Sequence, residues 1–261
     1  MRTTTRLALL GTSVALIATA AGATAAQAED GGAGDITLDK VVVNGGKPVV
    51  VGTTKVVSFK VSVTASDDSG IAETRYIRGT GATPNFASAW ADDGDISCVK
   101  VSDTTSTCTA TLSFDPQAAT GFVGNSAAGT WNLGTLVTAH DTDYIHRDAA
   151  TTFKVQRFSR LTTNAAPEPV KKGRTITVTG SLTRANWDTS KYMGYTKQPV
   201  KLQFKKKGAS TYSTVKTVTS SSTGGLKTTV TAATDGYWRY SFAGTSTTPA
   251  VNSTSDFVDV Q

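Results

Sequence analysis

Five aspartates in the first half of the chain lie in short segments that are rich in turn-forming residues. They are Asp67 and Asp68 in SDDSG, Asp103 in SDTTS, and Asp141 and Asp143 in HDTDY. Calcium takes six to eight oxygen ligands in tolerant geometry, so aspartates that gather at one place could bind it. Aspartate also stabilises turns by bonding to the backbone, and the chain has no EF-hand spacing. These five residues are a candidate calcium site, provided that the fold brings their turns together.

Six cations in the second half of the chain form two short runs. They are Lys171, Lys172 and Arg174 in VKKGR, and Lys205, Lys206 and Lys207 in QFKKKG. Clustered cations attract polyanions through the release of counter-ions. A lysine-rich surface also keeps a domain soluble and protects strand edges, which is the alternative. We predict binding to anionic cell-envelope polymers. Nucleic acid is less favoured because no aromatic side chains are interleaved with these cations.

A third candidate feature is the aromatic segment ANWDTSKYMGYT, which contains Trp187, Tyr192 and Tyr195. Exposed aromatic rings can stack on sugars, and a carbohydrate-binding module is therefore one interpretation. The other interpretation, which we prefer, is that this loop packs between two domains.

Motifs for catalysis are missing from the sequence. The only histidines, His140 and His146, have no HExxH motif or cysteine partner to complete a zinc site. The segments DDSG and VTAHD occur in the wrong order for a chymotrypsin-like triad. No phosphate loop, dinucleotide fingerprint or nucleophile elbow is present. We predict a protein that is not an enzyme and requires no cofactor. A hydrolase that acts through paired carboxylates is the alternative.

The N-terminal segment has the pattern of a secretory signal. Arg2 and Arg6 precede a short apolar run, and the triplet Ala26-Gln27-Ala28 predicts cleavage after Ala28. No second apolar segment follows, so we predict a secreted protein without a membrane span. In an oxidising compartment the only two cysteines, Cys98 and Cys108, should form one disulfide.

Short runs that alternate between apolar and polar residues predict an all-β protein. The clearest is 55–65, where Val57, Phe59, Val61 and Val63 share one face. The other predicted strands of the first half are 36–43, 71–78, 96–101, 107–114, 130–140 and 150–158. Those of the second half are 160–166, 174–184, 198–207, 211–220, 226–233, 236–244 and 255–261. Seven strands in each half predict two antiparallel β-sandwiches.

The predicted domains are a signal peptide (1–28), a flexible N-terminus (29–35) and two sandwiches (36–158 and 159–261). Their charges differ in sign. The first half, from residue 29 to 158, has 10 Lys and Arg against 15 Asp and Glu, which is −5, whereas the second has 14 against 5, which is +9. This contrast bears on partners rather than on fold.

Several motifs resemble known proteins. The segments DDSGI and GTW…VTAHD…ATTFKVQR resemble bacterial Ig-like domains. The segments NAAPEPVKKGRTITVTGSLTRANWD and DGYWRYSFAG are similar to the C-terminal module of a family of secreted streptomycete (actinobacterial) proteins. The resemblance implies two tandem Ig-like sandwiches, and some members of that family are labelled calcium-binding. The disulfide departs from antibody domains because it does not join strands B and F.

Antiparallel topology predicts where these features meet. The aspartate-bearing turns should lie at one end of the first sandwich, and the six cations at the far end of the second. The aromatic loop should face Asp92, Asp93, Asp95 and Asp115 across the domain junction. We therefore predict a secreted, non-enzymatic Ig-like binding or structural protein that engages cell-wall polyanions, with calcium binding as the alternative.

Overall fold

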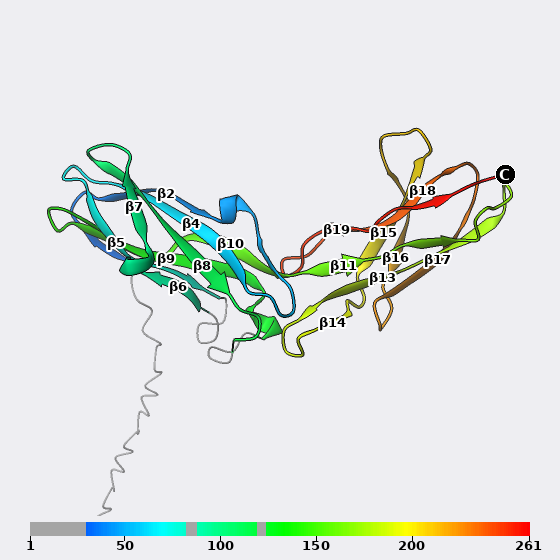
Figure 1. Cartoon of the computed structure of the whole chain (residues 1–261), viewed down its shortest axis with the longest axis horizontal. Coiled ribbons are helices and arrows are strands. Elements are labelled where there is room, and N and C mark those ends of the chain that lie inside the picture. Colours follow the sequence, from blue (N-terminus) through cyan, green and yellow to red (C-terminus); the bar gives the residue numbers. More distant parts are fainter. Residues whose placement is uncertain (1–29, 82–87, 119–123) are drawn as a thin grey trace, which may run out of the picture.

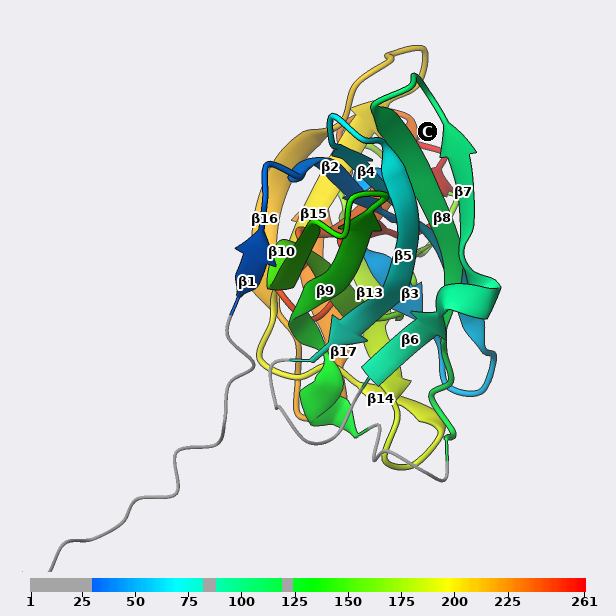
Figure 2. The ribbon, with the colours of Figure 1, turned by 90° about the vertical axis from the view of Figure 1, so that its left-hand side faces the viewer.

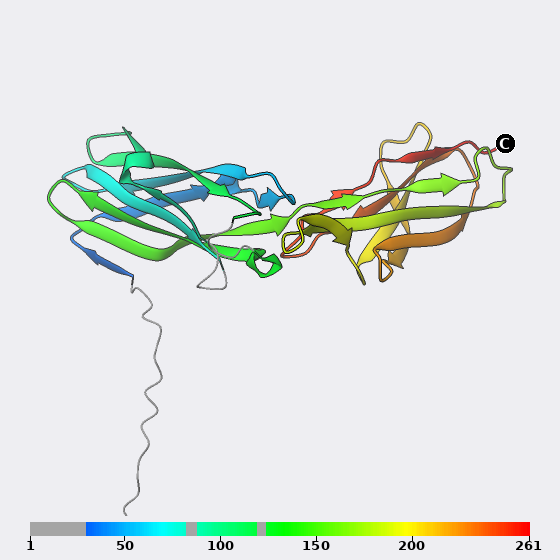
Figure 3. The same ribbon diagram turned by 60° about the horizontal axis from the view of Figure 1, so that its bottom comes forward.

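The computed structural model describes residues 30–81, 88–118 and 124–261. The signal peptide and its cleavage after Ala28 lie outside the described residues. Two lobes follow one another along the long axis of the molecule, as Figures 1 and 3 show. Each lobe contains two facing β-sheets, so the all-β sandwich fold is confirmed. No helix among the described residues is long and apolar enough to cross a membrane.

The first lobe has one four-stranded antiparallel sheet. Its strands, in spatial order, are β2 (Thr37–Val43), β4 (Val57–Ser66), β8 (Thr105–Phe114) and β7 (Ser97–Lys100). Along β4 the predicted residues Phe59, Val61 and Val63 are buried, because successive side chains point to opposite faces. Cys98 lies directly opposite Cys108 in the β7–β8 hairpin, and the two form the predicted disulfide.

Figure 2 shows the second sheet of the first lobe from the outer end of that lobe. Its strands, in spatial order, are β1 (Gly31–Ala33), β10 (Tyr144–Arg157), β9 (Gly129–Ala139), β5 (Ile71–Thr80) and β6 (Ser88–Asp92), and β3 (Val49–Val51) pairs in parallel with β10. Short 3-10 turns cover Asn44–Gly46, Asp93–Asp95 and Asn125–Ala127.

The short strands β3 and β6 of this sheet were not predicted, and two further features differ from the sequence prediction. The segment 29–35, expected to be flexible, contains β1, which pairs with Tyr144–His146 of β10. Because β1 is glycine-rich, it has no alternating pattern to reveal it. Strand β10 begins at Tyr144 instead of residue 150, since a register shift between Arg147 and Thr151 interrupts the alternation.

The second lobe also consists of two antiparallel sheets. Around β13 (Thr175–Asn186) lie β11 (Ser159–Leu161), β12 (Asn164–Ala166), β14 (Lys191–Gly194) and β17 (Gly225–Thr231). The facing sheet contains β16 (Ser213–Thr219), β15 (Pro199–Lys206), β18 (Gly236–Phe242), β19 (Val251–Asn252) and β20 (Asp256–Val258). Strand β20 is shorter than the predicted 255–261, although Val260 still forms a bridge with Val170.

The buried apolar side chains form two clusters. The cluster of the first lobe surrounds Trp131, and that of the second lobe surrounds Tyr240, whose hydroxyl donates to the Val178 carbonyl at 3.0 Å. Two residues of β13 and its following loop, Ala185 and Trp187, belong to the first cluster. The aromatic loop therefore joins the two lobes through a shared hydrophobic core.

Candidate functional site

The turns that follow β4 and β9 lie side by side at the outer end of the first lobe. The His140 amide donates to the Gly70 carbonyl at 3.1 Å, and the Asp141 amide donates to Ser69 Oγ at 3.2 Å. Carboxylate oxygens of Asp67, Asp141 and Asp143 lie within 4.8 Å of one another. Asp67, Asp141 and Asp143 are therefore close enough to share one cation.

Asp67 is the central residue of this acidic end. Its side chain is buried, at 4% exposure, and its Oδ1 accepts from the Ser69 amide at 2.8 Å and from Ser69 Oγ at 2.6 Å. Its Oδ2 is also buried and has no hydrogen-bond partner among the described residues. A buried carboxylate oxygen without a donor is unfavourable, and a bound cation would compensate it.

Asp35, which the sequence analysis missed, also belongs to this end. One carboxylate oxygen each from Asp35, Asp67 and Asp68 lie within 4.8 Å of one another. The negative charge of Asp68 is the main cause that raises the pKa of the Asp35 carboxyl, and desolvation, Asp67 and Asp143 add to it. Asp35 lies in the segment expected to be flexible. Its position beside the other aspartates became visible only from the pairing of β1 with β10.

The approach of Asp35 to the β9–β10 turn requires a glycine at position 34. The Asp35 amide donates to Asp143 Oδ2 at 2.9 Å, and Gly34 has a positive φ of 83°. A Cβ atom at residue 34 would lie 1.3 Å from that same Asp143 oxygen. Any other residue at this position would displace the Asp143 side chain.

Asp103 lies apart from the other predicted aspartates. Its carboxylate belongs to neither of the two groups that could hold a metal, and it is fully exposed. It pairs with Lys100, its neighbour in the β7–β8 hairpin, at 3.0 Å. The hairpin reaches the correct end of the lobe, but this side chain turns away from the other aspartates. Among the described residues, neither group includes His140 or His146.

The two cation runs lie at the far end of the second lobe, but they do not form one cluster of unpaired charges. Lys207 Nζ lies 3.4 Å from Asp235 Oδ2, and Asp235 Oδ1 accepts from the Val260 amide at 2.9 Å. That amide is the main cause that lowers the pKa of Asp235, and Lys207 contributes. The Lys172 amide donates to the Gln261 carbonyl at 2.8 Å, which ties the run of Lys171, Lys172 and Arg174 to the same end.

Lys205 differs from the expected arrangement. It belongs to β15 and its ammonium lies over the rings of Tyr212 and Tyr237, at 5.2 and 5.0 Å from their centroids. The side chain therefore lies on the outer face of the sheet and not in the loop at the tip. The side chain of the preceding residue, Phe204, points to the opposite face of the sheet and packs against Trp238 and the core.

The aromatic loop is occupied in contacts between and within the lobes. The Trp187 side chain is 3% exposed, its ring lies 5.1 Å from that of Phe114, and its Nε1 donates to the Gly52 carbonyl at 2.8 Å. The guanidinium of Arg184 lies 3.8 Å from the ring centroid of buried Tyr195, and that of Arg160 lies 3.5 Å from Tyr192. These contacts leave Trp187 and Tyr195 without an open face for sugar stacking.

The polar contacts of this loop come from a different part of the first lobe than expected. Asn125 Oδ1 accepts from the Trp187 amide at 3.0 Å, and the Asn125 amide donates to Asp188 Oδ1 at 3.0 Å. Gln117 Nε2 donates to Ser190 Oγ at 3.4 Å. In the part of the first lobe that the structure describes, the side chains bonding to this loop are therefore Asn125 and Gln117, and not Asp92, Asp95 or Asp115.

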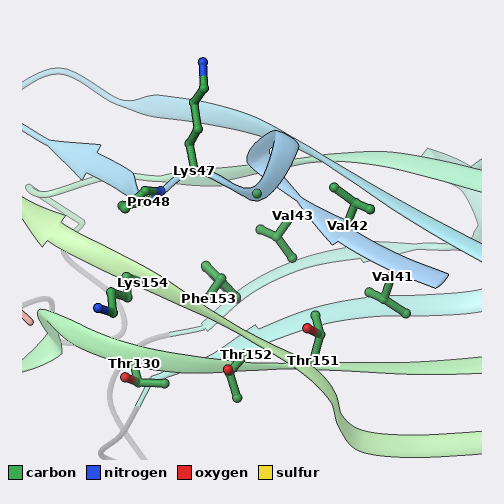
Figure 4. Close-up of a pocket in the computed structure, with 11 residues that line it drawn as sticks. Val41, Val42, Val43, Lys47, Pro48, Thr130, Thr151, Thr152, Phe153 and Lys154 are labelled. Carbon is green, nitrogen blue, oxygen red and sulfur yellow. The ribbon is translucent and has the colours of Figure 1, made fainter.

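The hollow in Figure 4 lies between β2 and β10 and has a volume of about 490 Å³. Its lining includes Val43, Lys47, Pro48, Phe153 and Lys154. The lining contains lysines and threonines but no carboxylate, histidine or cysteine.

The facing antiparallel sheets of both lobes define an all-β protein of the Ig-like class. No family model and no curated protein sequence matches this chain. Similar solved structures include the titin domains Z1Z2 in complex with telethonin, with 11% identity over 87% of this chain and 96% of that chain and a TM-score of 0.24. The Yersinia pseudotuberculosis adhesin InvE has 14% identity over 84% of this chain and 58% of that chain, with a TM-score of 0.27. The three N-terminal domains of the bacteriophage RB49 outer capsid protein Hoc have 9% identity over 87% of this chain and 70% of that chain, with a TM-score of 0.32. Similarity at this level says nothing about ligand or activity.

Proposed function

We propose that this protein is a secreted, non-enzymatic Ig-like binding protein whose second lobe engages anionic polymers of the cell envelope. The observation that carries this proposal is the charge of the second half of the chain, +9, against −5 for the first half. Lys171, Lys172, Arg174, Lys206 and Lys207 are exposed. Lys172 bonds to Gln261, and Lys207 pairs with Asp235, which bonds to Val260. Figure 1 places this C-terminal segment at the end of the second lobe away from the first lobe. This end remains accessible when the first lobe is attached.

Binding of the full secreted chain to polygalacturonate and to polyphosphate tests this proposal, with neutral dextran as the control polymer. If about four cations displace counter-ions, affinity should fall about 10²-fold between 50 and 200 mM salt. Dextran should not bind. Affinity that does not change with salt, or equal binding to dextran, would contradict a polyanion ligand.

Calcium binding at the acidic end of the first lobe is a second candidate function. The supporting observation is the buried Asp67 Oδ2, which has no hydrogen-bond partner among the described residues and lies within the group of aspartates. A bound cation would also offset the repulsion that raises the pKa of Asp35.

Thermal unfolding in 10 mM calcium and in EDTA checks this candidate. For a Kd of about 10⁻⁴ M, calcium should stabilise the folded state by about 2.7 kcal/mol and raise the melting temperature by several degrees. The variant Asp67→Asn should lose most of this shift. The matched variant Asp103→Asn should keep it, because Asp103 is exposed and pairs with Lys100. A melting temperature that is the same in calcium and in EDTA would remove calcium from consideration.

A further inference from the structure

The outer face of one sheet of the second lobe has a row of cations held on aromatic rings. Strand β15 alternates between buried Val200 and Leu202 and outward-facing residues, and β18 and β20 do the same beside it. The residues on this face are Gln203, Lys205, Lys207, Tyr212, Tyr237, Arg239 and Phe257. We call it the ring-held row, and it contains Lys205, Lys207 and Arg239 as its cations.

Each cation of the row lies over at least one ring. The Arg239 guanidinium is 3.8 Å from the ring centroid of Tyr212, and Lys207 Nζ is 5.5 Å from that of Phe257. Lys205 Nζ lies between the rings of Tyr212 and Tyr237, at 5.2 and 5.0 Å. Contacts of this kind are favourable because the face of an aromatic ring carries partial negative charge.

Further contacts hold the rings and the arginine in place. The rings of Tyr237 and Phe257 lie 5.1 Å apart, and the Tyr212 hydroxyl bonds to Ser255 Oγ at 2.5 Å. Arg239 Nε donates to Gln203 Oε1 at 2.8 Å, and no hydrogen bond from its two Nη atoms is found among the described residues. The planar end of Arg239 is therefore oriented and able to donate to a carboxylate in two parallel hydrogen bonds.

A row of fixed charges differs from the loop cations at the tip. A free lysine side chain loses rotational freedom when it binds, and a side chain that already lies on a ring loses less. Lys205 lies near the end of β15, and Lys207 lies in the turn that follows this strand. The charge of Lys207 is partly neutralised by Asp235. Lys205 and Arg239 are therefore the two cations of the row that should attract an anionic ligand most strongly.

We propose that the ring-held row is the binding surface for a linear polysaccharide with carboxylate groups, an inference that rests on the polyanion-binding function proposed above. The row is cationic, so its charge is complementary to that polymer. Single-stranded nucleic acid is less well suited, because bases stack on open ring faces. Here Tyr212, Tyr237 and Phe257 each have a cation over the ring.

Isothermal titration of the full secreted chain compares three probes, which are polygalacturonate, its fully methyl-esterified form and an oligothymidylate of about the same length. Two double variants each remove two positive charges, but from different parts of the second lobe. Lys205→Gln with Arg239→Gln changes the ring-held row, and Lys171→Gln with Lys172→Gln changes the tip loop. We expect the row variant to bind polygalacturonate at least about tenfold more weakly and the tip variant at most about threefold more weakly. The methyl ester should not bind, and the oligothymidylate should bind more weakly than polygalacturonate.

A third variant, Tyr212→Leu, removes a ring and keeps every charge. Because Arg239 and Lys205 both lie over this ring, we expect affinity to fall severalfold. Unchanged affinity would show that the ring does not hold the cations and would overturn the inference. Circular dichroism and the melting temperature of each variant establish that the second lobe is folded.

The outcomes separate this inference from the proposed function. Equal losses in the row and tip variants, or a greater loss in the tip variant, would overturn the row as the site while polyanion binding stands. Oligothymidylate binding as tightly as polygalacturonate would overturn the polysaccharide as its occupant. A wild-type protein that binds no polyanion would overturn both.

Discussion

Replacing Trp187 with alanine is expected to lower the free energy of unfolding by about 3 to 5 kcal/mol, the usual cost of truncating a buried aromatic residue. The side chain lies in the core of the first lobe although the residue directly follows β13 of the second lobe. Its removal would leave a cavity beside Phe114 and would leave the Gly52 carbonyl without the indole donor. We therefore also expect the two lobes to move more independently, which urea unfolding and small-angle scattering would measure.

The matched control is Trp90→Ala, which removes the same side chain from a position where it is 67% exposed. That variant should lower the unfolding free energy by less than about 0.5 kcal/mol, as surface substitutions do. If both variants lowered the unfolding free energy by the same amount, the burial of Trp187 in the shared core would not contribute to stability. If Trp187→Ala destabilised the protein but left the scattering profile unchanged, the loop would not set the arrangement of the lobes.

Removing the disulfide, by changing Cys98 and Cys108 together to alanine, should cost roughly 2.7 kcal/mol. This value follows from the entropy of closing an 11-residue loop in the unfolded chain. The bond joins β7 to β8 at one edge of the four-stranded sheet. Because β7 is exposed throughout and pairs only with β8 among the described strands, it should be the first strand to separate from the sheet. Denaturant unfolding measures the cost, and hydrogen exchange of the β7 amides measures the separation.

A suitable control is the pair Ser58→Ala and Ser113→Ala. These residues lie opposite each other on β4 and β8, where their hydroxyls are 2.9 Å apart. Losing that exposed hydrogen bond should cost about 1 kcal/mol or less. If the double cysteine variant were as stable as the wild type, the disulfide would not restrict the unfolded chain. The hairpin would then persist in the unfolded chain without the bond.

If both proposed sites exist, they lie in different lobes of the molecule. The acidic group is at the outer end of the first lobe, and the ring-held row is in the second lobe, beyond the junction formed by Trp187. The first lobe would then respond to calcium and the second to polyanions. The Trp187 contact would keep the spacing between the sites constant.

The strands and the disulfide of this protein follow from the sequence. The alternation of Phe59, Val61 and Val63 predicts β4, because side-chain direction in a strand repeats every two residues and is encoded locally. The cysteines are placed symmetrically about residue 103, so a hairpin between them brings them opposite each other. The prediction missed β1, whose glycines carry no such pattern, and it started β10 too late because a register shift interrupts the alternation.

Tertiary structure alone decided which side chains share a site. Asp35 joins the acidic group through the pairing of β1 with β10, and Asp103 is left out because its side chain turns toward Lys100. Lys205, Tyr212 and Phe257 meet although up to 52 residues separate them, because β15, β18 and β20 are neighbours in one sheet. The physical reason is the range of the interactions involved. Strand alternation depends on adjacent residues, whereas the direction of a loop side chain and the register between distant strands depend on the whole packed fold.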